Sequence, residues 1–294
     1  MSSSLARRLR QPGLITAPGV FDLISAKIAD RLGFDALYMT GYGTVASHLG
    51  YPDAGLATYS DMLGRVRQMV TGIETPLIAD GDTGYGGLLN VEHTVRGYEA
   101  AGAQAIQLED QEFPKKCGHT RNRRVIPMAD AAAKIRVAAE ARDSKDFLII
   151  ARTDARTGHG LDEALRRGEA YAKAGADILF IEAPETVEEI ERIGASFDLP
   201  LLANMVDGGR TPLLSRGDLE RLGFAIAIFP VTGFLAAAAA MASAYDHLKG
   251  NGSSKDWRGE LYSFDDFSLL MGFEKVWEFE RRHAPQPEAD EGSG

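Results

Sequence analysis

The stretch Ala101-Gly102-Ala103-Gln104-Ala105-Ile106-Gln107-Leu108-Glu109-Asp110-Gln111 contains the unit that decides the fold. A glycine ends a helical pattern, a short apolar run predicts a buried strand, and acidic residues follow the strand. The same helix-ending glycine stands before other apolar runs, at Gly33, Gly175 and Gly223. This repetition predicts helices that alternate with the parallel strands of one sheet.

Eight apolar runs of this kind are present, and polar or glycine-rich residues follow them: 14–18, 36–40, 76–79, 105–108, 147–151, 178–181, 201–203 and 225–229. Eight repeated units predict an α/β chain folded as a (β/α)8 TIM barrel, with its active site at the C-terminal strand ends. A doubly wound open sheet is the alternative. The glycines after the second and third runs do not follow its G-x-G-x-x-G phosphate fingerprint. We therefore predict a barrel over residues 1–250.

The chain beyond the barrel contains a second feature, a flexible break followed by an apolar helix. The break is Gly250-Asn251-Gly252-Ser253-Ser254, and the amphipathic helix covers about 264–281 within a helical segment 251–283. Such an apolar helix needs a partner surface, either its own barrel or a neighbouring subunit. We expect the tail 284–294 to be disordered.

Composition excludes several classes of function. The 294 residues have a net charge of −10 and a single cysteine. No basic stripe is available to neutralise phosphates, so we expect no nucleic-acid partner. The alanine-rich run 235–244 is too short to cross a membrane, and no secretory signal is visible. One cysteine permits no internal disulfide, which favours a cytoplasmic location.

Carboxylates follow three of the predicted strands: Asp80 and Asp82, Glu109, and Glu182. Gathered at one barrel mouth, they would repel each other unless a hard cation lay among them. Mg²⁺ takes oxygen ligands and leaves room for substrate oxygens, and Mn²⁺ is the alternative ion. The acids could instead cap the following helices or pair with Arg152 and lysines.

The single cysteine, Cys117, lies in the run Pro114-Lys115-Lys116-Cys117-Gly118-His119. Neighbouring ammonium and imidazole groups are expected to lower the pKa of its thiol, which would then exchange a proton near neutral pH or act as a nucleophile. The alternative is a small buried hydrophobe. Lys115 and Lys116 could be solvated loop charges, and His119 either caps the loop or exchanges protons.

Anion-binding groups are expected at the same mouth. Arg152 suits a bidentate grip on a carboxylate or phosphate. Gly43 and Thr44 offer backbone N–H groups at a turn into a helix, and Asn204 could donate to a carboxylate. Tyr42 is expected in the pocket wall. Together these residues predict a magnesium-assisted pocket for a small, multiply anionic acid.

Seven motifs carry a resemblance to a known family. They are Thr40-Gly41-Tyr42-Gly43-Thr44, Leu49-Gly50-Tyr51-Pro52-Asp53, Ala79-Asp80-Gly81-Asp82-Thr83-Gly84, Leu108-Glu109-Asp110-Gln111, the cysteine run, Ala151-Arg152-Thr153-Asp154-Ala155-Arg156 and Leu202-Ala203-Asn204-Met205. In order and content they resemble the isocitrate lyase/phosphoenolpyruvate mutase superfamily. The resemblance implies a final helix swapped between subunits and a homotetramer built from two swapped dimers. It also implies a catalytic loop, about 111–124, that delivers Cys117.

The cysteine run is similar to that of the carbon–carbon lyases, whereas phosphonopyruvate-forming mutases carry an asparagine-serine version. The resemblance implies that a 2-hydroxy acid loses its hydroxyl proton, its C2–C3 bond breaks, and Cys117 protonates the carbanion. It implies Asp80 and Asp82 as metal ligands. The remaining catalytic and substrate-binding positions would be Lys115, His119, Arg152, Glu109, Tyr42, Gly43, Thr44, Asp53, Gly118, Glu182, Asn204, Pro230 and Thr232, with Glu109 and Glu182 in an outer position.

The choice of substrate depends on two positions near the eighth strand. Methylisocitrate lyases carry an arginine for a third carboxylate where this chain has Leu235. The resemblance therefore favours dicarboxylates, namely 2,3-dimethylmalate and other 2-alkylmalates, cleaved to a 2-oxo acid such as pyruvate plus a carboxylate. Oxaloacetate hydrolases and petal-death-type proteins carry a serine where this chain has Pro230. Carboxyphosphonoenolpyruvate mutase shares the cysteine run and the proline, and stays an alternative.

Two further classes compete with an enzyme. A non-catalytic binding protein would need only the anion grip, and the joint presence of the acids, Cys117 and Arg152 argues against it. A thiol redox sensor would use Cys117 alone, but the chain has no second cysteine to resolve an oxidised thiol.

Overall fold

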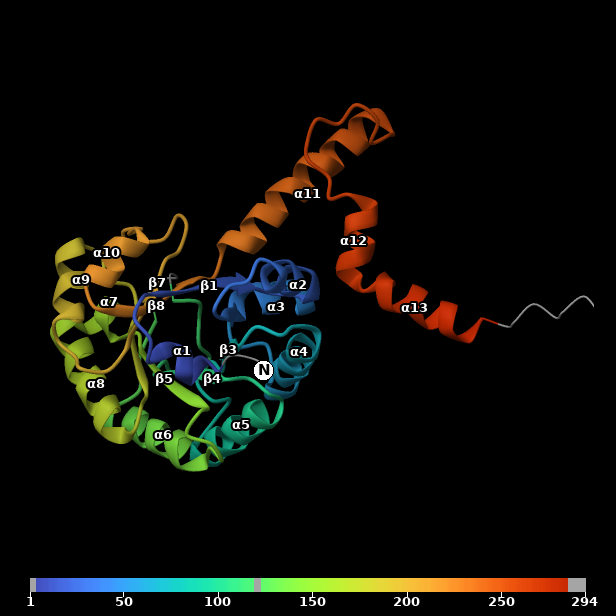
Figure 1. Ribbon diagram of the computed structural model, residues 1–294. Helices are drawn as coiled ribbons and strands as arrows, with labels where there is room; N and C mark the ends of the chain where they lie inside the picture. The colour runs from blue at the N-terminus through green and yellow to red at the C-terminus, as the bar shows by residue number, and fades with distance from the viewer. Residues whose placement is uncertain (1–3, 119–122, 285–294) are drawn as a thin grey trace, which may run out of the picture. The chain divides into compact units, whose positions relative to one another are not determined.

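The computed structural model describes residues 4–118 and 123–284 and contains a closed barrel of eight parallel strands in chain order (Figure 1). The predictions for His119 and for the tail beyond residue 284 lie outside the described residues. The strands are β1 (Ile15–Val20), β2 (Leu37–Met39), β3 (Leu77–Asp80), β4 (Ala105–Glu109), β5 (Leu148–Thr153), β6 (Ile178–Ile181), β7 (Leu201–Asn204) and β8 (Phe224–Phe229). The predicted (β/α)8 barrel is confirmed.

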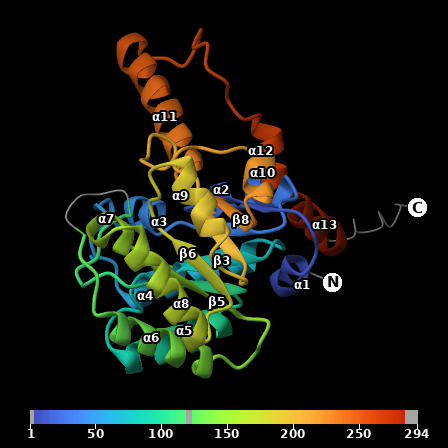
Figure 2. The same ribbon diagram turned by 90° about the vertical axis from the view of Figure 1, so that its left-hand side faces the viewer.

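The helices that connect successive strands surround the barrel on its outer side (Figure 1, Figure 2). The described helices are α1 (Leu5–Leu9), α2 (Leu23–Arg31), α3 (Gly41–Leu49), α4 (Tyr59–Gly72), α5 (Leu88–Ala100), α6 (Met128–Ala141), α7 (Ala155–His159), α8 (Leu161–Ala174), α9 (Val187–Gly194), α10 (Arg216–Arg221), α11 (Thr232–Asn251), α12 (Phe264–Met271) and α13 (Phe273–His283). None of these helices is long and apolar enough to cross a membrane.

The glycines predicted to end helices have the conformation expected for that position. Gly33, Gly102, Gly175 and Gly223 all have positive φ, at 77°, 93°, 107° and 84°. A residue with a Cβ is disfavoured in this left-handed region, so glycine lets the chain leave each helix and turn directly into the next strand.

Two hydrophobic layers hold the barrel together. One lies between the strands and the outer helices and includes Val66, Val95 and Ile135. The other fills the barrel with side chains such as Ile78, Ile150 and Phe180, and α1 packs against it. The interior is thus a packed core, and space for a ligand is left at one end of the barrel.

Strand register brings polar residues of neighbouring strands together. Glu109 of β4 is the cross-strand partner of Arg152 of β5, and Asp80 of β3 is the partner of Gln107 of β4. Asp80, Glu109 and Arg152 lie at or next to the C-terminal ends of their strands, which is where barrel enzymes place their active sites.

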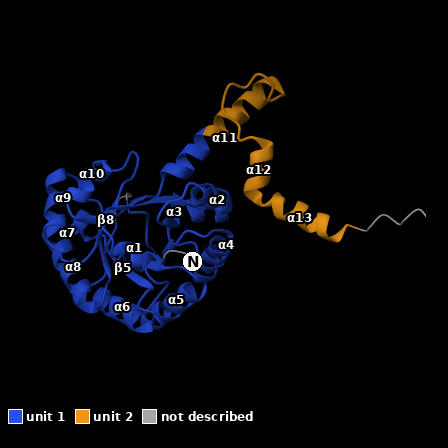
Figure 3. Cartoon of the chain, in the orientation of Figure 1, with its two compact units in different colours: residues 1–239 blue, residues 240–294 orange. Residues whose placement is uncertain are grey.

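The chain divides into two compact units, residues 1–239 and 240–294, and the division falls inside α11 (Figure 3). The boundary expected at residue 250 stays a prediction, and α11 ends at Asn251. The apolar helix expected over about 264–281 is two helices, α12 and α13. Gly272 separates them with a φ of 92°, a conformation that does not continue an α-helix.

Candidate active site

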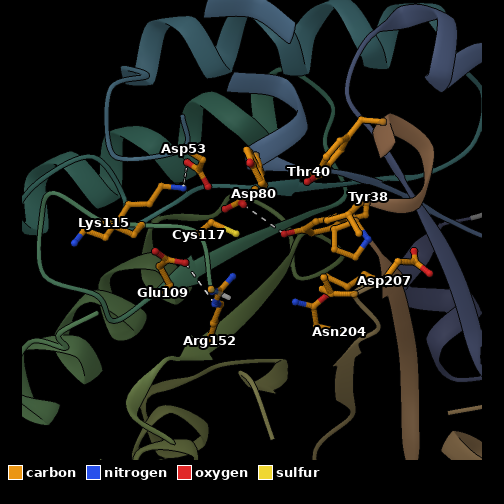
Figure 4. Close-up of a pocket in the computed structure, with 18 of the residues that line it drawn as sticks. Tyr38, Thr40, Asp53, Asp80, Glu109, Lys115, Cys117, Arg152, Asn204 and Asp207 are labelled. Carbon is orange, nitrogen blue, oxygen red and sulfur yellow. Dashed lines mark hydrogen bonds and ion pairs between the residues drawn. The ribbon is translucent and has the colours of Figure 1, made fainter. Parts of the chain in front are cut away.

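Charged and amide side chains converge at the C-terminal strand ends (Figure 4). Asp80, Glu109 and Asn204 are the last residues of β3, β4 and β7. Arg152 is the second-last residue of β5, and Glu182 directly follows β6. Because all strands are parallel, these ends meet at one mouth of the barrel.

A cavity of about 210 Å³ lies at this mouth. It collects ten of the predicted site residues: Tyr42, Asp53, Asp80, Glu109, Lys115, Cys117, Gly118, Arg152, Asn204 and Pro230. Apolar side chains form another part of the wall: Val206, Ile228, Val231, Phe234 and Leu235. The cavity therefore has one strongly charged part of its wall and one apolar part.

Lys115 is buried, with its side chain 3% exposed, so it is not a solvated loop charge. Its Nζ lies 2.5 Å from Asp53 Oδ1 and also forms an ion pair with Asp82 Oδ1. Burial alone would lower the pKa of Lys115, but these two carboxylates raise it well above its ordinary value. Lys115 is thus a buried cation that the chain itself supplies to the acidic mouth.

The acids themselves are held in an environment that disfavours their charge. Burial raises the pKa of Asp82 to about 7, although Lys115 opposes the shift. Burial also raises the pKa of Glu109 well above its usual range, with Arg152 acting in the opposite direction. Asp80 accepts from the Asp82 N–H at 3.0 Å. So many buried carboxylates favour an additional cation.

The donor set fits Mg²⁺. Asp80 and Glu109 line the cavity, and Glu109 Oε1 is buried without a hydrogen-bond partner among the described residues. Within residues 4–118 and 123–284, no three His, Cys, Asp or Glu side chains form a complete cage. Mg²⁺ does not need one, because it keeps waters and uses one or two carboxylates plus substrate oxygens. Asp82 does not line the cavity and pairs with Lys115, so its direct coordination stays a prediction.

Cys117 is brought to the cavity by a segment that leaves β4 and returns before α6. We call its two described arms, residues 111–118 and 123–125, the cysteine segment. The arms pair through a bridge between Gln111 and Val125 and through the Glu112 N–H, which donates to the Arg124 carbonyl at 2.8 Å. At the tip, the Cys117 N–H donates to the Asp53 carbonyl at 3.2 Å. Asp53 therefore holds both Lys115 and the backbone of Cys117.

Gly118 allows the cysteine segment to approach Arg152 closely. A Cβ at this position would lie 2.3 Å from Arg152 Nη2 and 2.9 Å from Glu182 Cδ. Neither side chain has room to move aside, because both are buried. The residue after Cys117 must therefore be glycine for the segment to adopt this position.

Arg152 is surrounded by carboxylates. Its Nε and Nη2 donate to the two oxygens of Asp154 at 2.9 and 3.0 Å. Nε lies 3.4 Å from Glu109 Oε2, and Nη2 lies 3.6 Å from Glu182 Oε2. The ring of Phe180 stacks 5.1 Å from the guanidinium carbon. Arg152 is thus held in one orientation at the mouth, as a preorganised anion site requires.

The predicted anion seat after β2 is corrected in part. Residues 41–49 form α3, and the Thr44 N–H donates to the Thr40 carbonyl at 3.0 Å as an ordinary helical bond. Gly43 lies in the first turn, whose N–H groups have no acceptor inside a helix. Tyr42 of this helix N-terminus lies in the cavity wall. The anion seat itself stays a prediction, and the Thr44 N–H is not available to it.

Two other predicted residues do not line the cavity. Glu182 is fully buried and accepts from Asn204 Nδ2 at 3.1 Å, so it supports the wall from an outer position, as the resemblance implied. Thr232 is exposed, and its hydroxyl donates to Asp207 at 2.5 Å. Thr232 was predicted to bind substrate. In the structure it instead contacts Asp207, which lines the cavity.

Several residues of the site were missed by sequence reasoning. The Tyr38 hydroxyl donates to Gln107 Oε1 at 3.0 Å and lies 3.5 Å from Asp80 Oδ2. Tyr38 and Gln107 were missed because each lies within an apolar run that predicts a buried strand. Gly41 was missed although it lies in a quoted motif, and a Cβ there would lie 2.5 Å from Asp80 Oδ2. A glycine that precedes a cavity residue was the available signal.

Comparison with known proteins agrees with this geometry. A family model described as phosphoenolpyruvate phosphomutase matches residues 5–249. The chain belongs to this family. The 2,3-dimethylmalate lyase of Eubacterium barkeri, a relative in the family, is 49% identical over 271 residues, which cover 92% of this chain and 94% of the relative. A 2-methylisocitrate lyase of Aeropyrum pernix is 39% identical over 280 residues, covering 95% and 89%.

Solved structures extend the family likeness to three dimensions. Oxaloacetate acetylhydrolase in complex with 3,3-difluorooxalacetate has a TM-score of 0.91 and 33% identity, with 97% of each chain covered. A crystal structure of 2,3-dimethylmalate lyase, described as a PEP mutase/isocitrate lyase superfamily member, has a TM-score of 0.89 and 36% identity, covering 100% and 98%. Phosphonopyruvate hydrolase in complex with oxalate and Mg²⁺ has a TM-score of 0.86 and 32% identity, covering 96% of this chain and 98% of that one. The superfamily predicted from the sequence is confirmed.

Proposed function

We propose that this protein is a magnesium-dependent carbon–carbon lyase that cleaves a 2-alkylmalate of the 2,3-dimethylmalate type to a 2-oxo acid such as pyruvate and a carboxylate. The observation that carries the proposal is the composition of one cavity. Cys117, Asp80 and Arg152 line it together with Leu235 and other apolar side chains. The 49% identity to a 2,3-dimethylmalate lyase over nearly the whole chain supports the same reaction.

Each residue has a separate task in this proposal. Arg152 binds the carboxylate of the oxo-acid half, and its contacts with Asp154 keep the guanidinium oriented. The N-terminus of α3 binds the second carboxylate. The C2 hydroxyl gives its proton to the carboxylate of Glu109, which lines the cavity. The C2–C3 bond then breaks with its electron pair on C3, and the Cys117 thiol donates a proton to C3. Lys115 holds the cysteine segment in place through Asp53 and Asp82.

Asp80, with Glu109 and Asp82 around it, would hold Mg²⁺ or Mn²⁺. Such an ion would supply a Lewis acid for the C2 oxygen of the substrate. The similar phosphonopyruvate hydrolase structure contains oxalate and Mg²⁺, which supports the choice of this ion.

The apolar wall supports an alkyl-substituted dicarboxylate over a tricarboxylate. Val206, Val231, Phe234 and Leu235 offer no cation to a third carboxylate, and an unpaired carboxylate in such a place costs several kcal/mol. Pro230 also lines the cavity and cannot donate a hydrogen bond to a hydrated oxaloacetate, which disfavours oxaloacetate hydrolysis. Carboxyphosphonoenolpyruvate phosphonomutase is the second candidate, because it shares the cysteine run and a proline at this position.

A substrate screen tests the proposal. We would incubate the purified protein and Mg²⁺ with 2,3-dimethylmalate, other 2-alkylmalates, methylisocitrate, oxaloacetate or carboxyphosphonoenolpyruvate, and follow products by proton and phosphorus NMR. We expect pyruvate release from the alkylmalates and its loss on adding EDTA. A change in the phosphorus spectrum with the last substrate alone would replace the lyase by the mutase.

Substituting Leu235→Arg is expected to move the substrate preference toward methylisocitrate. Leu235 lines the cavity from the first turn of α11, so a guanidinium there can pair with a third carboxylate. We expect the ratio of kcat/KM for methylisocitrate over 2,3-dimethylmalate to rise by about 10²-fold. Leu235→Met is the matched control and should leave the ratio within about threefold. An unchanged ratio in the arginine variant would remove Leu235 from substrate selection.

We also infer that the protein is a cytoplasmic homotetramer of two helix-swapped dimers. In the C-terminal unit, α12 and α13 leave Phe264, Phe273, Trp277 and Phe279 exposed, and apolar side chains of this size favour burial in an interface. We expect light scattering to give the mass of four chains, and dimers or monomers after truncation at residue 251. A full-length chain that is monomeric at micromolar concentration would contradict the swap.

A further inference from the structure

The carboxylate of Asp154 lies between two arginines that belong to different parts of the site. Arg152 of β5 donates to both of its oxygens, at 2.9 and 3.0 Å. Arg123 of the cysteine segment forms an ion pair with Asp154 Oδ1 through Nη1. The Asp154 side chain is completely buried, so both contacts are shielded from water.

Arg123 is the buried anchor of the returning arm of the cysteine segment. Its side chain is 1% exposed, although it belongs to a connection between a strand and a helix. Besides the ion pair with Asp154, its Nη2 donates to the Thr157 hydroxyl of α7 at 2.6 Å. A buried guanidinium that loses its partner is strongly unfavourable, so the returning arm is stable in this position only while Asp154 faces it.

Asp154 is itself rigidly placed, and a helix-capping role does not explain it. It precedes α7, but its side chain makes no capping hydrogen bond. Its N–H donates to Asp110 Oδ1 at 2.9 Å, and Asp110 also accepts from Thr153, Arg167 and Tyr171 at 2.7, 3.0 and 2.7 Å. This network fixes the backbone from which the carboxylate reaches both arginines.

We propose that Asp154 and Arg123 are positioning residues that couple docking of the cysteine segment to the orientation of Arg152. The proposal rests on the proposed function, in which Cys117 and Arg152 act on the two halves of one substrate. When Arg123 is docked, Asp154 bridges two cations and holds Arg152 through both oxygens. When Arg123 is not docked, Asp154 has lost one of its two cations, and its carboxylate holds Arg152 in a less fixed orientation. By reciprocity, an anion that orders Arg152 also favours docking of the segment.

The test uses Arg123→Met, with Arg124→Met as the matched control. Arg124 is the next residue, and its side chain is 81% exposed and pairs only with Glu112 among its described ion pairs. We expect Arg123→Met to lower kcat on 2,3-dimethylmalate by about 10-fold to 100-fold with a smaller change in KM. The control should stay within about twofold of the wild type, because exposed ion pairs contribute little.

A second readout needs no turnover. Cys117 is the only cysteine, so the rate of alkylation by iodoacetamide, followed by mass spectrometry, reports how well the segment is docked. Mg²⁺ plus oxalate should slow alkylation of the thiol in the wild type and in Arg124→Met. In Arg123→Met, the factor by which they slow alkylation should be at least fivefold smaller. If 2-alkylmalates are not the substrates, turnover fails in every variant while the alkylation difference persists, so the two failures are distinguishable.

A double-mutant cycle separates coupling from a general loss of structure. Asp154→Asn should also lower kcat and the protection of Cys117 from alkylation. Adding Arg123→Met to the Asp154→Asn variant should have at most a third of the effect that Arg123→Met has in the wild type. Arg123→Lys keeps the charge and should recover part of the protection. If Arg123→Met folds less well, Arg123→Lys and Asp154→Asn are used alone. Additive effects, or wild-type kcat and protection in Arg123→Met, would overturn the proposal.

Discussion

Replacing Cys117 with serine is expected to lower kcat on 2,3-dimethylmalate by about 10³-fold while the protein stays folded. The thiol lines the cavity on a segment whose backbone is fastened to Asp53. A serine hydroxyl has nearly the same size and leaves the backbone hydrogen bond intact. Its proton is far less acidic than that of a thiol, so it protonates a carbanion poorly. Steady-state kinetics with NMR detection of pyruvate measures the loss.

The serine variant should still bind oxalate with Mg²⁺, because Asp80, Arg152 and α3 are unchanged. Calorimetric titration of oxalate into wild type and variant is the control, and we expect dissociation constants within about threefold. Thermal unfolding should also coincide. A serine variant that cleaves 2-alkylmalates at the wild-type rate would exclude Cys117 as the proton donor and would remove the main support for the lyase proposal.

Replacing Arg152 with lysine is expected to lower kcat/KM by about 10²-fold to 10³-fold although the positive charge is kept. The guanidinium contacts Asp154 with two nitrogens and lies 3.4 Å from Glu109. A lysine ammonium is a single point charge and cannot bind Asp154 and a substrate carboxylate in the same fixed geometry. Oxalate affinity should fall together with kcat/KM.

Arg142→Lys is the matched control for this change. Arg142 is also a buried arginine, and it pairs with Asp177 and donates to the Phe147 carbonyl at 2.7 Å, but it does not line the cavity. Both variants should lose stability through their weaker pairing, and only Arg152→Lys should lose oxalate binding and turnover. Equal losses of activity in the two variants would mean that Arg152 acts through stability alone.

The fold was predictable because its signals are local. A buried strand of a barrel is a short apolar run, and a glycine in the left-handed conformation, as at Gly102, ends the helix before it. The order of the strands follows from the chirality and length of the connections. Even the break between α12 and α13 has a local sign in Gly272, although the continuous apolar pattern concealed it.

The site was predictable at its strand ends and less so elsewhere. Because parallel strands end at one mouth, Asp80, Glu109, Arg152 and Asn204 follow from the strand pattern itself. The partners of Lys115 do not, because Asp53 and Asp82 are far from it in the chain and meet it only when the cysteine segment lies across the mouth. Thr44 was misplaced for a related reason, since its N–H is taken by the helix that begins at Gly41.

Residue order alone predicted a barrel, its acidic rim and a thiol beside that rim, since each depends on neighbours a few positions apart. Tertiary structure alone decided which charges meet. The bridge from Arg123 through Asp154 to Arg152 joins a connecting segment to a strand end. Ion pairs of this kind form only below about 4 Å, and such distances depend on strand tilt, side-chain packing and the path of the segment, none of which is encoded by spacing along the chain.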